Sequence, residues 1–85
     1  MDTAHVTYLG ALRTEATHVR SGQTIITDAP PDNQGRGEAF SPSDLLATSL
    51  ASCMMTIMGI AARDKGIPLN GLTARVVKHM TPAPR

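Results

Sequence analysis

The chain has 85 residues, 41% of them hydrophobic, and a formal net charge of +1, so it is at most one small domain of ordinary globular composition. Eight Lys and Arg residues are scattered among seven acidic ones, which argues against the basic stripe of a nucleic-acid-binding protein. A single Cys excludes a disulfide framework and a multi-cysteine zinc site within these residues. A lone thiol suits a reducing compartment, and no secretory signal pattern is present, so we expect a cytoplasmic protein.

Aromatic residues are scarce: the chain has one Tyr, one Phe and no Trp. A small domain that folds alone usually depends on such bulky side chains to bury enough apolar surface. We therefore expect either that the chain is part of a longer one or that a partner completes its core.

The first part of the chain, about residues 3–28, predicts two or three strands joined as a meander. Val6, Tyr8 and Leu12 alternate with polar positions, as in a half-buried strand. Gly10 interrupts this alternation and indicates a bulge. Two further short runs follow, separated by a Ser-Gly turn signal.

A loop rich in Pro, Gly, Asn and Asp is predicted over residues 29–40, and a long helix over about 42–64. Ser41 is a favourable N-cap, and Pro42 suits the first helical position. Asp44 stands where a capping box places an acid. The Gly-Ile-Pro segment after the helix is a typical stop signal.

The centre of this helix, residues 45–62, contains no charged side chain and is close to the minimum length of a membrane span. Its polar residues, its acidic first turn and the lack of a flanking Lys/Arg cluster favour instead a helix buried in a soluble protein. One small sheet covers only one side of a helix, yet two apolar stripes are present: Leu46, Leu50, Cys53, Ile57 and Ile60, and then Met54, Met58 and Ala61. We expect the second stripe to meet further C-terminal chain or a second subunit.

Alternation over about residues 71–80 predicts a final strand. The order of strands, one long helix and one strand predicts an α+β fold, with an antiparallel sheet packed on a long central helix. We treat residues 1–85 as a single domain. Because the sequence stops directly after the last strand, we expect it to be truncated relative to a longer domain.

Cys53 lies about three turns into the predicted helix. Its position leaves two interpretations open, a small buried core residue or a reactive thiol. The helix dipole offers little at this depth, so reactivity requires a nearby cation, and Arg13, Arg20 and Arg36 are the candidates. The His residues show no metal-binding spacing, and no metal site is expected.

The segment FSPSDLLATSLASCMMTIMGIAARDKGIPLNGL resembles the signature of the OsmC/Ohr superfamily, the osmotically inducible and organic hydroperoxide resistance proteins. The resemblance rests on Ser-Pro at 41–42, Ala-Ser-Cys at 51–53 and Gly-Ile-Pro at 66–68, in that order and spacing. The upstream segment THVRSGQTIITDAP and the glycine-rich loop are similar to the OsmC-like branch.

The resemblance implies an intertwined homodimer whose subunits share each active site, acting in the oxidative stress response. It implies that the thiolate of Cys53 attacks the distal oxygen of an alkyl hydroperoxide and yields an alcohol and a cysteine sulfenic acid. A second Cys from the C-terminal half then condenses with that acid, and a dithiol reductant restores the pair. No metal, organic cofactor, nucleic acid or membrane is implied.

Family members activate the cysteine with an Arg and a Glu that orients it. The family's Glu falls at Ser43, where it is absent, and Asp44, one residue further on, is the candidate acid. Arg13 lies in the strand region that the hydroperoxide resistance branch uses for its Arg, and Arg36 in the loop position used by the other branch. The alternative function is a non-catalytic OsmC-like homodimer or fragment that binds a small apolar ligand near Cys53.

Overall fold

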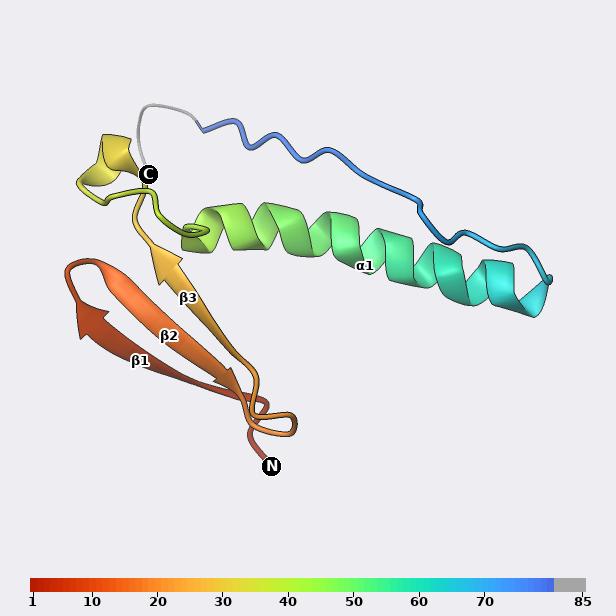
Figure 1. Ribbon diagram of the computed structural model, residues 1–85, viewed down its shortest axis with the longest axis horizontal. Helices are drawn as coiled ribbons and strands as arrows, with labels where there is room; N and C mark the ends of the chain where they lie inside the picture. The colour runs from red at the N-terminus through yellow and green to blue at the C-terminus, as the bar shows by residue number, and fades with distance from the viewer. Residues whose placement is uncertain (81–85) are drawn as a thin grey trace. The chain divides into compact units, whose positions relative to one another are not determined.

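The computed structural model describes residues 1–80, whose elements divide between two compact units (Figure 1). The first unit, Met1–Ser43, contains the three strands β1 (Ala4–Gly10), β2 (Arg13–His18) and β3 (Thr24–Asp28) and the short 3-10 helix η1 (Pro31–Asn33). The second unit begins at Asp44 and contains nearly all of helix α1 (Pro42–Asp64). Strands followed by one long helix confirm the predicted α+β class.

The sheet is an antiparallel meander in the order β1-β2-β3. Its register shifts between Tyr8 and Gly10, which confirms the bulge predicted at Gly10. Leu12, expected within a strand, lies instead in the two-residue turn between β1 and β2. Ala11 and Leu12 have φ values of 55° and 65°, because tight hairpin turns whose twist matches that of the strands need positive φ at both central positions.

Hydrogen bonds on both sides of Leu12 hold this turn in place. Its backbone N–H donates to the hydroxyl of Tyr8 at 3.2 Å, and its carbonyl accepts the N–H of Ala29 at 3.2 Å. The left-handed region costs a residue other than glycine about 1–2 kcal/mol, so such bonds are needed to maintain it. The turn thereby determines where β2 begins, at Arg13.

The loop after β3 folds back on itself. Gly35 and Gly37 donate their backbone N–H groups to the carbonyls of Pro30 and Ala29, at 3.0 and 3.1 Å. A Cβ atom at position 35 would lie 1.7 Å from the carbonyl oxygen of Ala29, so only glycine fits there. This close approach returns the chain to the end of β3 and brings Glu38 alongside it.

Helix α1 runs over Pro42–Asp64, as predicted from its local start and stop signals. Its end is a Schellman motif, in which Gly66 has a φ of 71°. Ile67 donates its N–H to the carbonyl of Ala62 at 2.8 Å, and Gly66 donates to that of Arg63 at 3.1 Å. Local chemistry therefore accounts for the C-terminal end of the helix.

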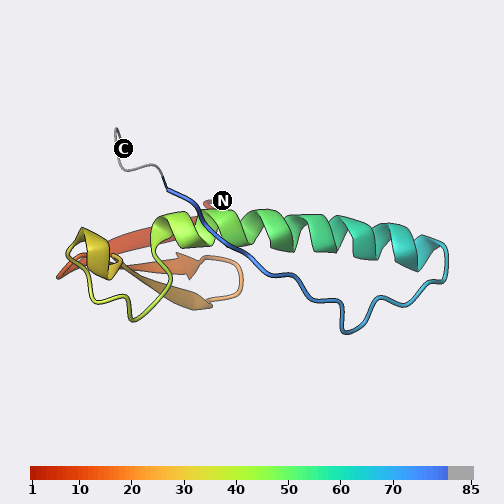
Figure 2. The ribbon, with the colours of Figure 1, turned by 90° about the horizontal axis from the view of Figure 1, so that it is seen from above.

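The expected burial of α1 is not observed: Ala62 is the one buried residue of the helix, and Cys53 is exposed. The segment after the helix turns and runs back along it (Figures 1 and 2). A single segment without regular structure cannot cover a helix that is apolar nearly all round. By length and composition α1 would also suffice to cross a membrane, and no part of its most apolar stretch is buried.

The strand predicted over about residues 71–80 does not form, since residues 72–80 have no strand assignment. The segment opens with a turn in which Leu72 donates its N–H to the carbonyl of Leu69 at 3.0 Å. Further on, the ammonium group of Lys78 pairs with Asp44 Oδ1 at 2.8 Å, at the start of α1. A strand requires the edge of another strand, and the described part of the second unit offers none.

Replacement of Gly35 by Ala tests the folded loop. The added Cβ must displace the carbonyl of Ala29, so the free energy of unfolding of the full-length protein should fall by about 1–3 kcal/mol, measured by chemical denaturation. Asn33→Ala in the same loop, whose side chain is exposed, is the matched control and should stay within about 0.5 kcal/mol of wild type. Equal stability of the two variants would contradict the observed loop.

Candidate functional site

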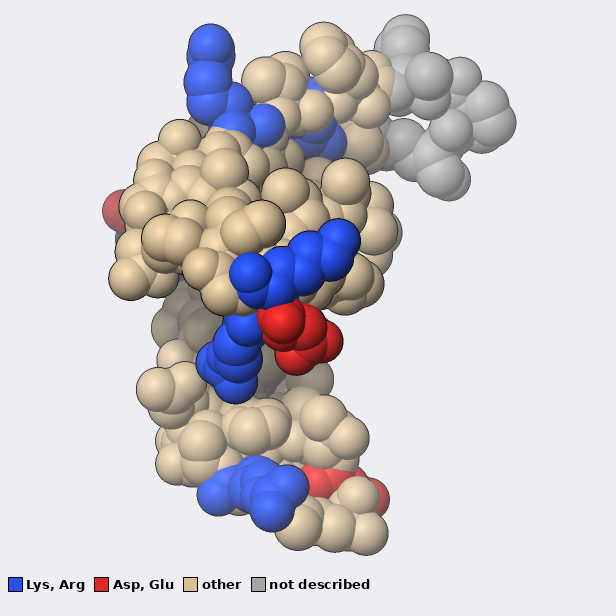
Figure 3. Space-filling model, turned by 90° about the vertical axis from the view of Figure 1, so that its right-hand side faces the viewer, with Lys and Arg blue, Asp and Glu red and all other residues tan. Residues whose placement is uncertain are grey.

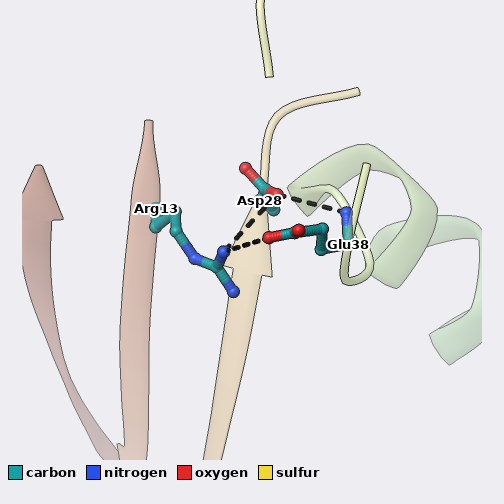
Figure 4. A network of polar contacts seen from close by, with 3 residues as sticks. All are labelled: Arg13, Asp28 and Glu38. Carbon is teal, nitrogen blue, oxygen red and sulfur yellow. Dashed lines mark hydrogen bonds and ion pairs between the residues drawn. The ribbon is translucent and has the colours of Figure 1, made fainter. Parts of the chain in front are cut away.

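Three charged side chains gather at the end of β3: Arg13, Asp28 and Glu38 (Figure 4). Arg13 Nη1 lies 2.8 Å from Glu38 Oε1, the distance of a charge-assisted hydrogen bond, and 3.8 Å from Asp28 Oδ2. Arg13 and Asp28 face each other in the register of β2 and β3. The sheet therefore positions two members of the cluster, and the folded loop supplies the third.

Asp28 is the buried member of this cluster. Its side chain is 0% exposed, and its Oδ2 accepts the backbone N–H of Glu38 at 3.2 Å. Its own backbone N–H donates to the carbonyl of Phe40 at 3.0 Å. Burial of a carboxylate is costly unless hydrogen bonds and an opposite charge compensate it, and here the loop and Arg13 provide both.

The Arg13–Glu38 pair lies nearer the protein surface than Asp28, with side chains that are 29% and 54% exposed. Two carboxylates surround one guanidinium, so the cluster has a formal charge of −1. Among the described residues, Nε and Nη2 of Arg13 have no hydrogen-bond partner. The cluster can therefore hold the guanidinium in one orientation while two of its nitrogen atoms stay available to an oxygen or sulfur anion.

The other predicted site residues lie in different surroundings. Arg36 is exposed in the loop, and within residues 1–80 no ion pair involves it. Asp44, the candidate acid, pairs with Lys78 in the second unit. The acids beside Arg13 are thus Glu38 and Asp28, and an orienting role of Asp44 stays a prediction.

Sequence reasoning missed Asp28 and Glu38. Glu38 is separated from Arg13 by 25 residues, and no local pattern marks it as the partner of that residue. A signal for Asp28 was nevertheless present, because it is the acid that ends β3, two positions after Ile26. An acid at the end of such a strand is rarely buried unless it is paired.

Cys53 lies on α1 with its side chain exposed, which corrects the expectation of a buried thiol. Next to it, the helix and the segment after it form an apolar groove of about 330 Å³ lined by Ala51, Met54, Met55, Met58, Leu72, Thr73 and Ala74. Cys53 is not among these lining residues. Within the described chain, no group of His, Cys, Asp and Glu is arranged to hold a metal ion.

The sequence model of the family described as OsmC-like protein matches residues 35–84, more than half of the chain. The chain belongs to the OsmC-like protein family. The matched region contains Glu38, Asp44 and Cys53. The resemblance inferred from the helix signature is therefore confirmed.

This OsmC-like chain is also similar to a crystal structure of a protein from Psychrobacter arcticus 273-4 that is named for induction by osmotic stress and for a detoxification response. The two are 65% identical, with a TM-score of 0.96, over 100% of this chain and 62% of the other. The chain thus spans 62% of the length of that neighbour. A comparison with curated proteins finds no match.

A double-mutant cycle tests the pairing of Arg13 with Glu38. Arg13→Met and Glu38→Gln should show a coupling energy of about 0.2–1 kcal/mol in the free energy of unfolding, as partly exposed ion pairs do. The control cycle combines Arg36→Met with Glu38→Gln and should show no coupling within error. Equal coupling in both cycles, or none in the first, would contradict the observed contact.

Proposed function

We propose that this OsmC-like protein reduces organic hydroperoxides through the thiol of Cys53, with Arg13 as the activating cation and Glu38 as the acid that orients it. The observation that carries the proposal is the 2.8 Å contact between Arg13 and Glu38. An arginine oriented by an acid is what the family resemblance requires, and the usual position of that acid, residue 43, is a serine. Family membership and the detoxification name of the similar protein support the same activity.

In the proposed reaction the thiolate of Cys53 attacks the distal oxygen of the hydroperoxide. An S–O bond forms as the O–O bond breaks, so the sulfur is oxidised to a sulfenic acid and the peroxide is reduced. The departing alkoxide takes a proton and leaves as an alcohol.

The role proposed for Arg13 follows from its charge and its unused donors. A guanidinium close to a cysteine favours the thiolate, which is the reactive form. The same group stabilises the negative charge that develops on the leaving oxygen as the O–O bond breaks. Glu38 reduces the number of rotamers open to the Arg13 side chain, so less entropy is lost when the reacting atoms meet.

The sulfenic acid must then be reduced to complete the cycle. The sequence contains one Cys, so the condensing thiol comes from outside these 85 residues. We propose a dithiol reductant, which is oxidised to a disulfide as Cys53 returns to a thiol and water is released. Such a reductant is available in the cytoplasm, the location expected for this protein.

We also propose that the working form is a homodimer. Most of the large apolar side chains along α1 are more than half exposed: Leu46, Leu50, Met54, Ile57 and Ile60. A monomer in water rarely keeps so large an apolar surface uncovered. Figure 3 shows Lys and Arg side chains beside acidic residues or among uncharged ones.

The groove beside α1 favours one alternative function. Its lining by Met54, Met55, Met58 and other apolar residues is typical of a site for a small apolar ligand. In that case Cys53 would have no chemical role. The same protein preparation distinguishes the two functions, because only the first predicts a change at the sulfur atom.

The activity is tested with reduced full-length protein and cumene hydroperoxide, with trapping of sulfenic acid at Cys53 by mass spectrometry. Trapping should be far faster than for free cysteine, and Cys53→Ser should abolish it. Arg13→Met should lower the rate constant on the order of 10²–10³-fold, because an electrostatic stabiliser is lost. Asp44→Asn should remain within a few-fold of wild type.

A rate no faster than that of free cysteine would reject the peroxidase and leave the apolar ligand as the better proposal. Equal loss in the Glu38→Gln and Asp44→Asn variants would reject the assignment of Glu38. Unfolding measurements on each variant separate a loss of chemistry from a loss of structure.

The homodimer is tested by light scattering after gel filtration of the full-length protein without detergent. Wild type should elute as a dimer, and Leu50→Lys should weaken it because a charge is placed on an apolar face. Asp64→Lys, at an exposed position that is already charged, is the control and should remain dimeric. A monomeric wild type would reject the proposal, and recovery only in detergent would place α1 in a membrane instead.

A further inference from the structure

The buried carboxylate of Asp28 contacts both members of the Arg13–Glu38 pair through the same oxygen atom. Oδ2 accepts the backbone N–H of Glu38 at 3.2 Å and lies 3.8 Å from Nη1 of Arg13. We propose that Asp28 is the positioning residue of this pair and acts on the reaction through Arg13, without touching the substrate. The inference rests on the peroxidase function proposed above.

The burial of Asp28 excludes direct contact with a substrate. Its side chain is 0% exposed, whereas Glu38 is 54% exposed. A flexible glutamate at the surface exchanges between its partner and water, and the Arg13–Glu38 bond alone would therefore hold the guanidinium loosely. A carboxylate buried in the sheet cannot make that exchange, and its charge acts on Arg13 with little screening by water.

The second oxygen of Asp28 makes no hydrogen bond within the described residues that would explain a carboxylate at this position. Oδ1 is buried and, within the described residues, has no hydrogen-bond partner. An unsatisfied buried oxygen costs about 1–3 kcal/mol, and an asparagine could accept the same N–H without bringing a buried charge. The charge itself is what distinguishes aspartate here, and the cation that it faces is Arg13.

The contacts of Asp28 also tie the pair to the sheet. Its backbone N–H donates to the carbonyl of Phe40, and its side chain holds the backbone of Glu38. Two positions of the loop, Glu38 and Phe40, are thus connected to Asp28, the last residue of β3. Arg13, on the neighbouring strand, is in register with the same residue. Asp28 therefore determines the place of the guanidinium and of its surface acid together.

The test uses Asp28→Asn in the full-length protein, a variant that keeps the shape and an acceptor for the Glu38 N–H and removes the charge. The first readout is the order parameter of the Arg13 Nε–H bond by NMR, which does not depend on activity. It should fall relative to wild type, because the guanidinium loses its buried partner. Asp2→Asn, which removes an exposed acid from the same unit, is the control and should leave it unchanged.

The second readout is the rate of sulfenic acid formation at Cys53. Asp28→Asn should lower it about tenfold to a hundredfold, the range expected when a reacting group is misplaced by about 1 Å. In an Arg13→Met background the same substitution should lower it no further, since its effect passes through Arg13. A purely structural role would instead lower the rate by the same factor in both backgrounds.

An unchanged order parameter, or equal rate losses in the two backgrounds, would overturn the positioning role. If the Asn variant does not fold, Asp28→Glu offers the second test: it moves the charge by one methylene and should change the Arg13 order parameter relative to wild type, whereas Asp2→Asn should not. An order parameter equal to that of wild type in the Asp28→Glu variant would also overturn the inference. A failure of the proposed peroxidase function is distinguishable from this. Sulfenic acid would then form slowly at Cys53 in wild type, while Asp28→Asn would still lower the order parameter of Arg13.

Discussion

The first unit depends on the burial of one carboxylate, that of Asp28. A charge removed from water must be compensated locally, and the compensation here comes from Arg13 on the next strand and from the backbone of Glu38. The folded loop after β3 is therefore more than a connection, because it supplies the backbone N–H that the buried carboxylate at the end of the sheet needs. The close approach of Gly35 to the carbonyl of Ala29 is the steric condition that lets the loop return.

In the second unit, the apolar helix α1 has too few neighbouring residues to bury its side chains. α1 is well specified at both ends, yet along its length Ala62 alone is buried. Helix formation and helix burial are separate matters: the first depends on caps and propensity, the second on neighbours. The exposed apolar side chains of α1 are the physical reason to propose a second subunit.

The proposed chemistry requires both the charged cluster around Arg13 and the cysteine on α1. A cysteine in the middle of a helix gains little from the helix dipole, so its reactivity depends on a cation supplied by another element. Arg13 is suited to the proposed role because its guanidinium pairs with Glu38 at the surface and lies close to the buried carboxylate of Asp28. The proposed orienting acid, Glu38, lies on the loop before the helix, and Ser43 occupies the position after the cap proline.

Features that depend on near neighbours could be predicted from the amino-acid sequence: the α+β class, the bounds of α1, the bulge at Gly10 and the family signature around Cys53. Features that depend on distant partners required the folded chain. It placed Leu12 in a turn, left residues 72–80 outside any strand and joined Arg13 to Glu38 across 25 residues. Caps and turns are encoded within a few residues, whereas ion pairs and strand pairing depend on how the chain closes its loops.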